Sequence, residues 1–250
     1  MPVPLSAPTV GEEELAAVAE VLASGWMAGQ GPKGAELEAG FASLTGVAHA
    51  VAVNNCTAGL HLVIGALGAG PGDDVLVADY SFPATGHAVA YCGATPRFVD
   101  VRADTGTIDV SLVEEAITPA TVGIVAVDAL GIPADLVQLE DLCARRGLFL
   151  VEDAACSAGG ELEGRPCGSF GDAAVFSLHA RKGITSGEGG VVVTRDEKLA
   201  ATVRRRACFG MASAHERQQQ VDLPVPTFDE LGHNYKLSDV LAAIAVVQLG

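Results

Sequence analysis

The sequence predicts an α/β fold, with a mainly parallel sheet of roughly seven strands covered by helices on both faces. Short apolar runs alternate along the chain with amphipathic or alanine-rich segments, which is the pattern of repeated β-α-β units. The chain has 250 residues and a hydrophobic content of 49%, which is enough to bury a full core. We therefore expect one large domain.

The positions of the apolar runs give the order of the elements. We expect strands at 49–53, 74–78, 96–100, 122–127, 148–152, 172–178 and 189–194. Helical patterns fall near 57–67, 84–92, 111–117, 135–146 and 196–209. The acidic run 12–14 suits the start of a helix at 15–23, because carboxylates stabilise a helix N-terminus. Ser238 caps a last apolar helix that still runs at Gly250, and the polar stretch 211–233 before it is expected to be a long loop.

Charge and composition exclude several classes of partner. The formal net charge of −16 leaves no surplus of basic side chains to neutralise nucleic acid or an anionic membrane. No apolar run approaches the ~18 residues that span a bilayer, and the first four residues lack the features of a signal peptide. The six cysteines show no zinc-like spacing, so we expect no metal site. The protein is expected to be cytoplasmic.

Asp153 and Lys182 are the residues that carry the most chemical information. Asp153 directly follows an apolar strand, and ligands of open parallel sheets bind beyond the carboxyl ends of the strands. Lys182 lies 29 positions later, before the glycine-rich segment 187–190. A lysine that bonds to an aldehyde, and an acid that keeps a pyridine nitrogen protonated, are what pyridoxal phosphate (PLP) requires. Taken singly, a helix-capping aspartate and a solvated lysine remain open alternatives.

Other segments near the expected strand ends could complete such a site. The turn before Thr57 and Ala58 ends a strand and opens a helix, whose N-terminal N–H groups suit a phosphate. Ser177 and Asn234 could add hydrogen bonds. The alternative reading of this turn is a plain helix cap. The glycine-rich string 68–72 follows a helix and precedes a strand, which disfavours an NAD-binding fold.

Phe82 and Cys156 could also face the site. Phe82 follows the strand 74–78, where an aromatic ring could stack on a planar cofactor. Cys156 comes three residues after Asp153. For both side chains, ordinary packing in the core is the competing interpretation.

Taken together and in order, these segments resemble the DegT/DnrJ/EryC1/StrS family of PLP-dependent sugar aminotransferases, of the aspartate aminotransferase fold type. The resemblance covers nearly the whole chain, and the ordered set of motifs is highly specific. Further motifs that carry it are Gly25–Pro32, Gly70–Asp73, Gly93–Pro96, Gly131–Asp135 and Gly232–Ser238.

The resemblance implies roles for the candidate residues. Lys182 would bond to the cofactor aldehyde, Asp153 would pair with the ring nitrogen, and Phe82 would stack on the ring. The phosphate would be bound by Thr57, Ala58 and Ser177. Asn234 matches a residue that reaches the phosphate of the neighbouring subunit, which implies a homodimer with shared active sites.

Two positions depart from the family pattern. Cys156 stands where glutamine or histidine is usual, near the phenolic oxygen of the cofactor, and Gly183 stands where asparagine is common. Family members also continue into a smaller C-terminal domain. Residues 1–250 are therefore expected to be the PLP-binding large domain, with its N-terminal segment, of a longer chain.

The function implied is transfer of an amino group from an amino acid, expected to be glutamate, to a keto group of a nucleotide-linked deoxysugar. A cyclitol ketone remains possible as acceptor. A PLP-dependent sugar dehydratase of the same family is an alternative, although those enzymes carry histidine at the position of Lys182. A non-catalytic protein that binds PLP or a sugar nucleotide is another alternative.

Overall fold

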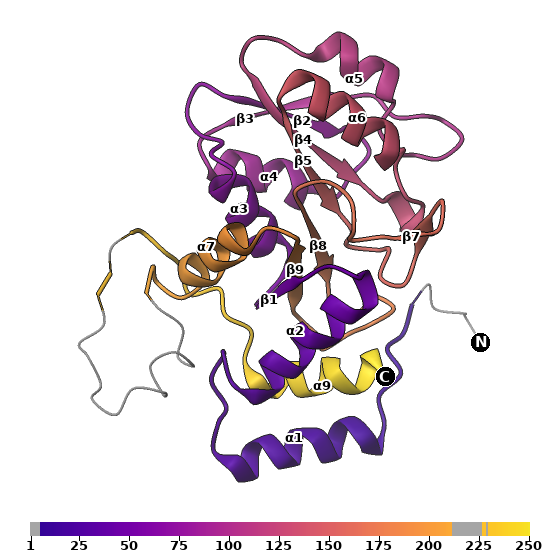
Figure 1. Ribbon diagram of the computed structural model, residues 1–250. Coiled ribbons are helices and arrows are strands. Elements are labelled where there is room, and N and C mark those ends of the chain that lie inside the picture. The colour runs from indigo at the N-terminus through magenta and orange to yellow at the C-terminus, as the bar shows by residue number, and fades with distance from the viewer. Residues whose placement is uncertain (1–5, 212–226, 229) are drawn as a thin grey trace.

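The computed structural model describes residues 6–211, 227–228 and 230–250. Its main feature is a seven-stranded sheet with the order β1-β9-β8-β5-β4-β2-β3 (Figure 1). The strands are β1 (His49–Val53), β2 (Asp74–Ala78), β3 (Thr95–Val99), β4 (Thr121–Val127), β5 (Phe149–Asp153), β8 (Ala173–Ser177) and β9 (Gly190–Thr194). The pairs from β8 through to β3 are parallel, and β9 runs antiparallel to both of its neighbours. The predicted fold class is confirmed.

Several helices start at residues whose side chains cap them. Side chains of Asn55, Asp135, Asp196 and Ser238 accept backbone N–H groups at helix starts. The helices are α1 (Glu12–Ser24), α2 (Pro32–Thr45), α3 (Cys56–Ala66), α4 (Pro83–Tyr91), α5 (Val110–Ala116), α6 (Leu136–Arg146), α7 (Glu197–Ala207) and α9 (Asp239–Leu249), with the short 3₁₀ segment η1 (Ala129–Gly131). In the described part of the chain, none of these helices combines the length and apolar content that a bilayer span requires.

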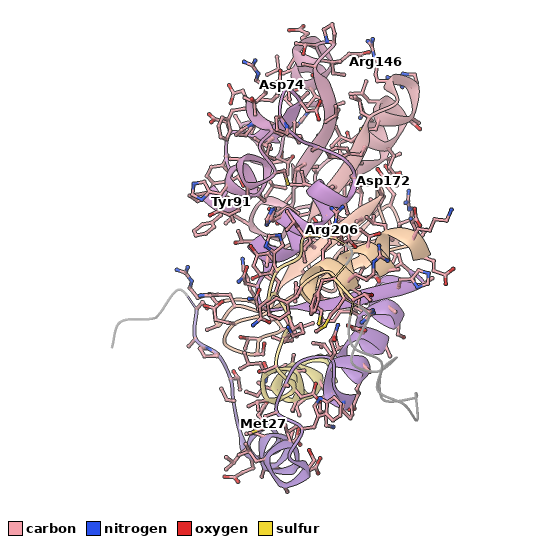
Figure 2. All side chains as sticks on the ribbon, turned by 90° about the vertical axis from the view of Figure 1, so that its left-hand side faces the viewer. Met27, Asp74, Tyr91, Arg146, Asp172 and Arg206 are labelled. Atoms are coloured by element: carbon pink, nitrogen blue, oxygen red, sulfur yellow. The ribbon has the colours of Figure 1, made fainter. Side chains whose placement is uncertain are left out.

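Helices cover both faces of the sheet, as expected. The helices α3, α4 and α7 pack on one face, over side chains such as Val77, Val151 and Val175. On the other face α5 and α6 cover the half around β4, and α2 and α9 cover the half around β8. Helix α1 lies outside α9, so Met27 and the end of α6 at Arg146 lie at opposite ends of the molecule (Figures 1 and 2).

Two elements were not predicted from the sequence. Helix α2 presents Leu37 and Phe41, four positions apart, to the core, but Gly34 and Gly40 weaken its helical signal. Its start is held from far along the chain, because the Asp239 carboxylate accepts the Gly34 N–H at 3.0 Å. The second is a small hairpin of β6 (Glu161–Leu162) and β7 (Arg165–Pro166). Most of the loop expected at 211–233 lies outside the described residues.

The topology brings several chain segments to one edge of the sheet. Because β9 is antiparallel to both β1 and β8, the last residue of β1 lies at the same edge as the ends of β8 and β5. The start of β9 at Gly190 lies there too, paired with both Val53 and Ser177. Ligands of open α/β sheets bind at this edge. The end of β5 is Asp153.

Candidate active site

Asp153 is a buried carboxylate with a fixed orientation. Its exposed fraction is 5%, and its Oδ2 accepts the hydroxyl of Thr85, on α4, at 2.7 Å. Its Oδ1 accepts the N–H of Ala155 at 3.3 Å. The Thr85 hydroxyl also lies 2.7 Å from Ser81 Oγ. Since the single proton of Thr85 goes to the carboxylate, Ser81 can donate to Thr85 in turn.

The protonation of Asp153 reflects its surroundings. Burial raises the pKa of this carboxyl, because the charged form loses its hydration. The Thr85 hydroxyl, the Ala155 N–H and the charge of Lys182 act in the opposite direction. A cation placed against the carboxylate would favour the ionised form further. The site is therefore suited to a ligand that carries a positive charge at this point.

The thiol of Cys56, at the first position of α3, faces the same carboxylate. Its Sγ lies 3.9 Å from Asp153 Oδ1 and 3.8 Å from the carbonyl oxygen of Val175. Burial and then the charge of Asp153 raise the pKa of this thiol well above its ordinary value. Cys56 therefore remains a neutral donor, and it brings the N-terminus of α3 against Asp153.

The N-terminus of α3 offers free backbone donors. Asn55 caps the helix and accepts the Ala58 N–H at 2.8 Å. Within the described residues, the N–H groups of Cys56 and Thr57 and the Thr57 hydroxyl have no hydrogen-bond partner. Such groups at a helix N-terminus bind anions.

Gly190 allows α3 to approach Ser177. A Cβ at Gly190 would lie 2.7 Å from Asn55 C and 2.8 Å from Cys56 N, closer than real atoms approach. Gly190 pairs directly with Ser177 at the end of β8. The Ser177 side chain is therefore a neighbour of the free N–H groups of α3, as the predicted phosphate site requires.

Lys182 lies in the segment between β8 and β9. Its Nζ lies 2.9 Å from the Sγ of Cys156, and its N–H donates to the carbonyl of His179 at 2.8 Å. The lysine side chain is half-exposed and Cys156 is exposed. The charge of Lys182 acts on both Asp153 and Cys56. These four side chains therefore form one cluster at the sheet edge.

Two aromatic side chains stand exposed beside this cluster. Phe82, at the N-cap of α4, is 73% exposed, and Tyr80 in the preceding loop is 53% exposed. Of the two interpretations of Phe82, packing in the core is therefore wrong. A large apolar ring in solvent, next to a cluster of polar groups, is available to stack on a planar ligand.

These groups fit pyridoxal phosphate. The free N–H groups of α3, with the hydroxyls of Thr57 and Ser177, suit the phosphate. The Asp153 carboxylate suits the ring nitrogen, and the Lys182 amine suits the aldehyde. The donor set thus matches each functional group of this molecule with a group of the opposite chemistry.

The structure brings together most of the predicted residues. Asp153, Cys156, Lys182, Thr57 and Ser177 share the edge, whereas the N–H of Ala58 is already bound by Asn55. Asn234 is exposed, and its Oδ1 accepts Lys236 Nζ. Its described contacts involve no other predicted site residue, so its role toward a neighbouring subunit stays a prediction.

Sequence reasoning missed Thr85 and the thiol of Cys56. Thr85 is 68 positions from Asp153 in the chain and looks like an ordinary residue in the first turn of a helix. Only the pairing of the strands places α4 beside β5. Cys56, in contrast, had a usable signal, because it adjoins Thr57 in the predicted anion-binding turn.

The site is not identified by cavity size. A hollow of about 450 Å³ is lined by residues of α2, β1 and α7, including Glu38 and Arg204. Another of about 820 Å³ is lined by Phe209, Phe228 and their neighbours. Neither is lined by any of the predicted site residues. The convergence of polar groups, not the shape of the surface, marks the site.

Comparison with known proteins gives a consistent result. The model of the DegT/DnrJ/EryC1/StrS aminotransferase family matches residues 8–250. The chain is 40% identical to the aminotransferase TlmJ from Streptoalloteichus hindustanus, with a TM-score of 0.91, over 99% of this chain and 66% of that one. It is 30% identical to Spr1654 from Streptococcus pneumoniae, described as a sugar aminotransferase and solved in its PMP-form, with a TM-score of 0.93, over 99% of this chain and 67% of that one.

A third similar structure is that of DesI, determined in the presence of its TDP-sugar product. The chain is 38% identical to DesI, with a TM-score of 0.86, over 98% of this chain and 59% of that one. The chain therefore spans about two thirds or less of the length of these relatives.

Proposed function

The chain belongs to the DegT/DnrJ/EryC1/StrS aminotransferase family, and we propose that its protein transfers an amino group to a keto sugar with PLP as cofactor. The predicted family is confirmed, and so are the aminotransferase class and the PLP cofactor of that family, of which Spr1654 has been solved in PLP- and PMP-forms. The specific substrates, the residue roles and the oligomeric state belong to the proposal.

The phosphate of PLP is assigned to the N-terminus of α3, and its ring nitrogen and aldehyde are assigned to Asp153 and Lys182. When bound, PLP supplies an electron sink that stabilises negative charge at the carbon from which a proton leaves. Asp153, ionised against the ring nitrogen, keeps that sink protonated. Thr85 would hold the carboxylate in one orientation through its 2.7 Å hydrogen bond. The N-terminus of α3 and Ser177 bind the phosphate.

Lys182 moves the proton. With the cofactor bound, its Nζ would hold the aldehyde, and as a free amine it would take a proton from the α-carbon of the amino donor and return it as general base and acid. Cys156, whose Sγ lies 2.9 Å from Nζ, would help to position that amine. Phe82 stacks on the ring and excludes water from that face.

The finer substrate assignment is glutamate as donor and a nucleotide-linked keto-deoxysugar as acceptor. The TDP-sugar product present with DesI supports a nucleotide sugar for this chain too. We further propose a homodimer in which Asn234 completes the partner's phosphate site. A cytoplasmic location, expected from the sequence, stays a prediction.

One observation carries the proposal. Asp153 and Lys182 come from different elements, yet both lie at one edge of the sheet, where Lys182 Nζ is 2.9 Å from the Sγ of Cys156, three residues after Asp153. The charge of Lys182 also lowers the pKa of the Asp153 carboxyl. The dehydratase alternative would replace the lysine.

The proposed activity can be tested by amino transfer. The protein in its pyridoxamine form is mixed with a panel of keto-sugar nucleotides, and the cofactor absorbance is followed. We expect one class of nucleotide sugar to return the cofactor to its PLP spectrum with formation of an amino sugar. Lys182→Ala should abolish this, and Lys198→Ala, which alters an exposed residue of α7, should not. Loss of oxygen from the sugar without gain of nitrogen would contradict the proposal and favour a dehydratase.

A further inference from the structure

Two further carboxyl side chains lie behind Asp153. Glu152 precedes Asp153 in β5, so its side chain points to the opposite face of the sheet, toward the loop after β7. Asp128 follows β4, and its N–H donates to the carbonyl of Asp153 at 3.1 Å. The exposed fractions of Asp128 and Glu152 are 1% and 0%. Neither carboxyl has contact with bulk water, and the candidate active site described above uses neither.

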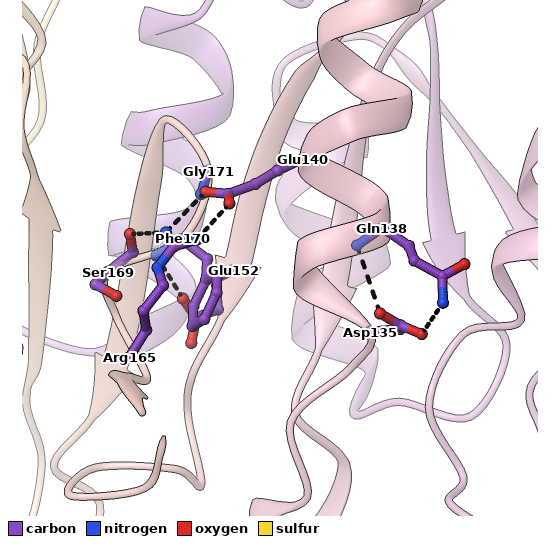
Figure 3. A network of polar contacts seen from close by, with 8 residues as sticks. All are labelled: Asp135, Gln138, Glu140, Glu152, Arg165, Ser169, Phe170 and Gly171. Atoms are coloured by element: carbon purple, nitrogen blue, oxygen red, sulfur yellow. Dashed lines mark hydrogen bonds and ion pairs between the residues drawn. The ribbon is translucent and has the colours of Figure 1, made fainter. Parts of the chain in front are cut away.

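Glu152 is held by backbone groups and lies close to Asp128. Its Oε1 accepts the Gly168 N–H at 2.8 Å. Its Oε2 accepts the Phe170 N–H at 3.4 Å (Figure 3). One carboxylate oxygen of Glu152 and one of Asp128 lie within 4.8 Å of each other. Two carboxyl groups this close together and out of contact with water cannot both be ionised, so one of them carries a proton.

No cation contacts the pair within the described residues. Arg165, in β7, is the basic group of the neighbouring loop, but its guanidinium binds Glu140 at 2.7 Å and the Ser169 carbonyl at 3.0 Å (Figure 3). Cys167 Sγ lies within 4.8 Å of both carboxyls. Burial raises the pKa of this thiol to about 12, so it is neutral.

Two ionised carboxylates are not stable in such surroundings. The charge of Asp153, whose side chain lies on the other face of β5, raises the pKa of Asp128 as well. Burial raises the pKa of both Asp128 and Glu152, and that of Glu152 is raised more, since its partner accepts the Ser157 hydroxyl at 2.5 Å and the Ala134 N–H at 3.1 Å.

We propose that Glu152 is a neutral carboxylic acid that donates a hydrogen bond to an ionised Asp128, and that this pair positions the turn 154–157. The Ser157 hydroxyl binds Asp128, and its N–H closes the turn onto Ala154 O at 3.1 Å. Cys156, within this turn, is thereby held against Lys182. Glu152 and Asp128 are positioning residues, and their effect on Lys182 rests on the proposed function. The protonation of Glu152 does not.

The protonation is tested by the pH dependence of unfolding. The full chain and Glu152→Gln, which keeps a donor toward Asp128, are unfolded with denaturant between pH 5 and pH 8 with no cofactor added. A neutral Glu152 costs the wild type stability as pH rises above the ordinary glutamate pKa, because only the unfolded state then releases the proton. The measured quantity is the equilibrium ratio of folded to unfolded protein. We expect this ratio for Glu152→Gln, divided by the ratio for wild type, to increase by as much as tenfold for each pH unit.

Glu140→Gln is the matched control. Burial raises the pKa of Glu140, but the hydrogen bond from Arg165 outweighs it and holds this pKa below its ordinary value. Glu140 is therefore ionised in both states over this pH range, and its variant should differ from wild type by a constant amount. A constant difference for Glu152→Gln as well would overturn the proposed neutral acid.

The positioning role is tested separately on the cofactor-loaded protein. Ser157→Ala removes the link between Asp128 and the turn, and we expect it to weaken PLP binding about tenfold. Unchanged PLP affinity in Ser157→Ala would overturn this half. If the wild type itself binds no PLP, the proposed function fails, but the pH test of Glu152 still stands.

Discussion

At the scale of single residues, the orientation of the Asp153 carboxylate is the detail on which the site depends. A pyridine nitrogen lies in the plane of its ring, so its acidic partner must present one oxygen in that plane. Thr85 fixes one carboxylate oxygen through a 2.7 Å hydrogen bond, and Ser81 lies 2.7 Å behind Thr85. The methyl group of Thr85 cannot donate a hydrogen bond and so does not orient the carboxylate.

Replacing Thr85 by valine should therefore reduce catalysis without unfolding the protein. Valine keeps the shape but loses the hydroxyl, and hydrogen bonds to charged groups contribute about 1.5–3 kcal/mol. We expect kcat/KM to fall roughly 10- to 100-fold for Thr85→Val. Thr85→Ser keeps the donor and should stay near wild type in the same steady-state assay. Equal activity in both variants would show that Thr85 does not orient Asp153.

At the scale of elements, the site depends on how closely the N-terminus of α3 approaches the sheet. Gly190 lets Asn55 and Cys56 lie over the start of β9, and a Cβ on Gly59 would lie 2.6 Å from Val175. Because neither contact carries a side chain on its glycine, α3 can pack close to the sheet at these two points. That approach places its free N–H groups beside Ser177.

Gly190→Ala should move the start of α3 outward. The added methyl meets backbone atoms that cannot rotate away, so we expect a loss of about 1–3 kcal/mol of stability. PLP affinity should fall as well, because the N–H groups lose their register with Ser177. Gly70→Ala, at a position with nothing within 4 Å, is the control for the loss of a glycine. Denaturant unfolding and PLP titration of both variants decide the matter.

At the scale of the whole molecule, several buried acidic side chains lie near one edge of the sheet, and their burial reduces the stability of the folded protein. Asp128, Glu152 and Asp153 are each at most 5% exposed. Burial raises the pKa of each of them. The folded state therefore loses stability relative to the unfolded state as pH rises, because these groups release their protons more readily in the unfolded chain. Binding of a cationic ring would offset this cost for Asp153.

Asp153→Asn should therefore stabilise the chain and weaken its response to the cofactor. The pKa of Asp153 is raised in the fold, so its contribution is full below the unfolded value of 3.8 and is lost as pH rises. We expect Asp153→Asn to raise the Tm at pH 7 without cofactor by roughly 2–4 °C. The gain should shrink toward pH 4.

The response to PLP gives the contrast. Wild type should gain thermal stability with added PLP, and Asp153→Asn should gain less. Equal gains in the two proteins would separate Asp153 from the cofactor.

Much of the sheet was predictable because buried parallel strands are short, continuous apolar runs. The strand expected at 49–53 is β1, and that expected at 96–100 is shifted by one residue from β3. Helix α2 was missed because Gly34 and Gly40 interrupt its pattern and its start is capped from Asp239. Capping by a residue over two hundred positions away leaves no local signal.

The candidate site divides in the same way. Asp153 and Lys182 could be proposed from the sequence because each lies at or shortly after the end of an apolar strand. Thr85 was not, since its partner is set by strand order, and the antiparallel placement of β9 also has no local signature. Residues that act through neighbours brought together by the fold require the structure.

The central claim is that the amine of Lys182 and the carboxylate of Asp153 bind one PLP molecule. The most direct measurement is to add PLP to the protein, reduce with borohydride and map the modified peptide by mass spectrometry. The account predicts a pyridoxyl group on Lys182, with much weaker labelling in Asp153→Asn. Labelling of another lysine, or equal labelling of Lys182 in the presence and absence of the Asp153 carboxylate, would contradict it.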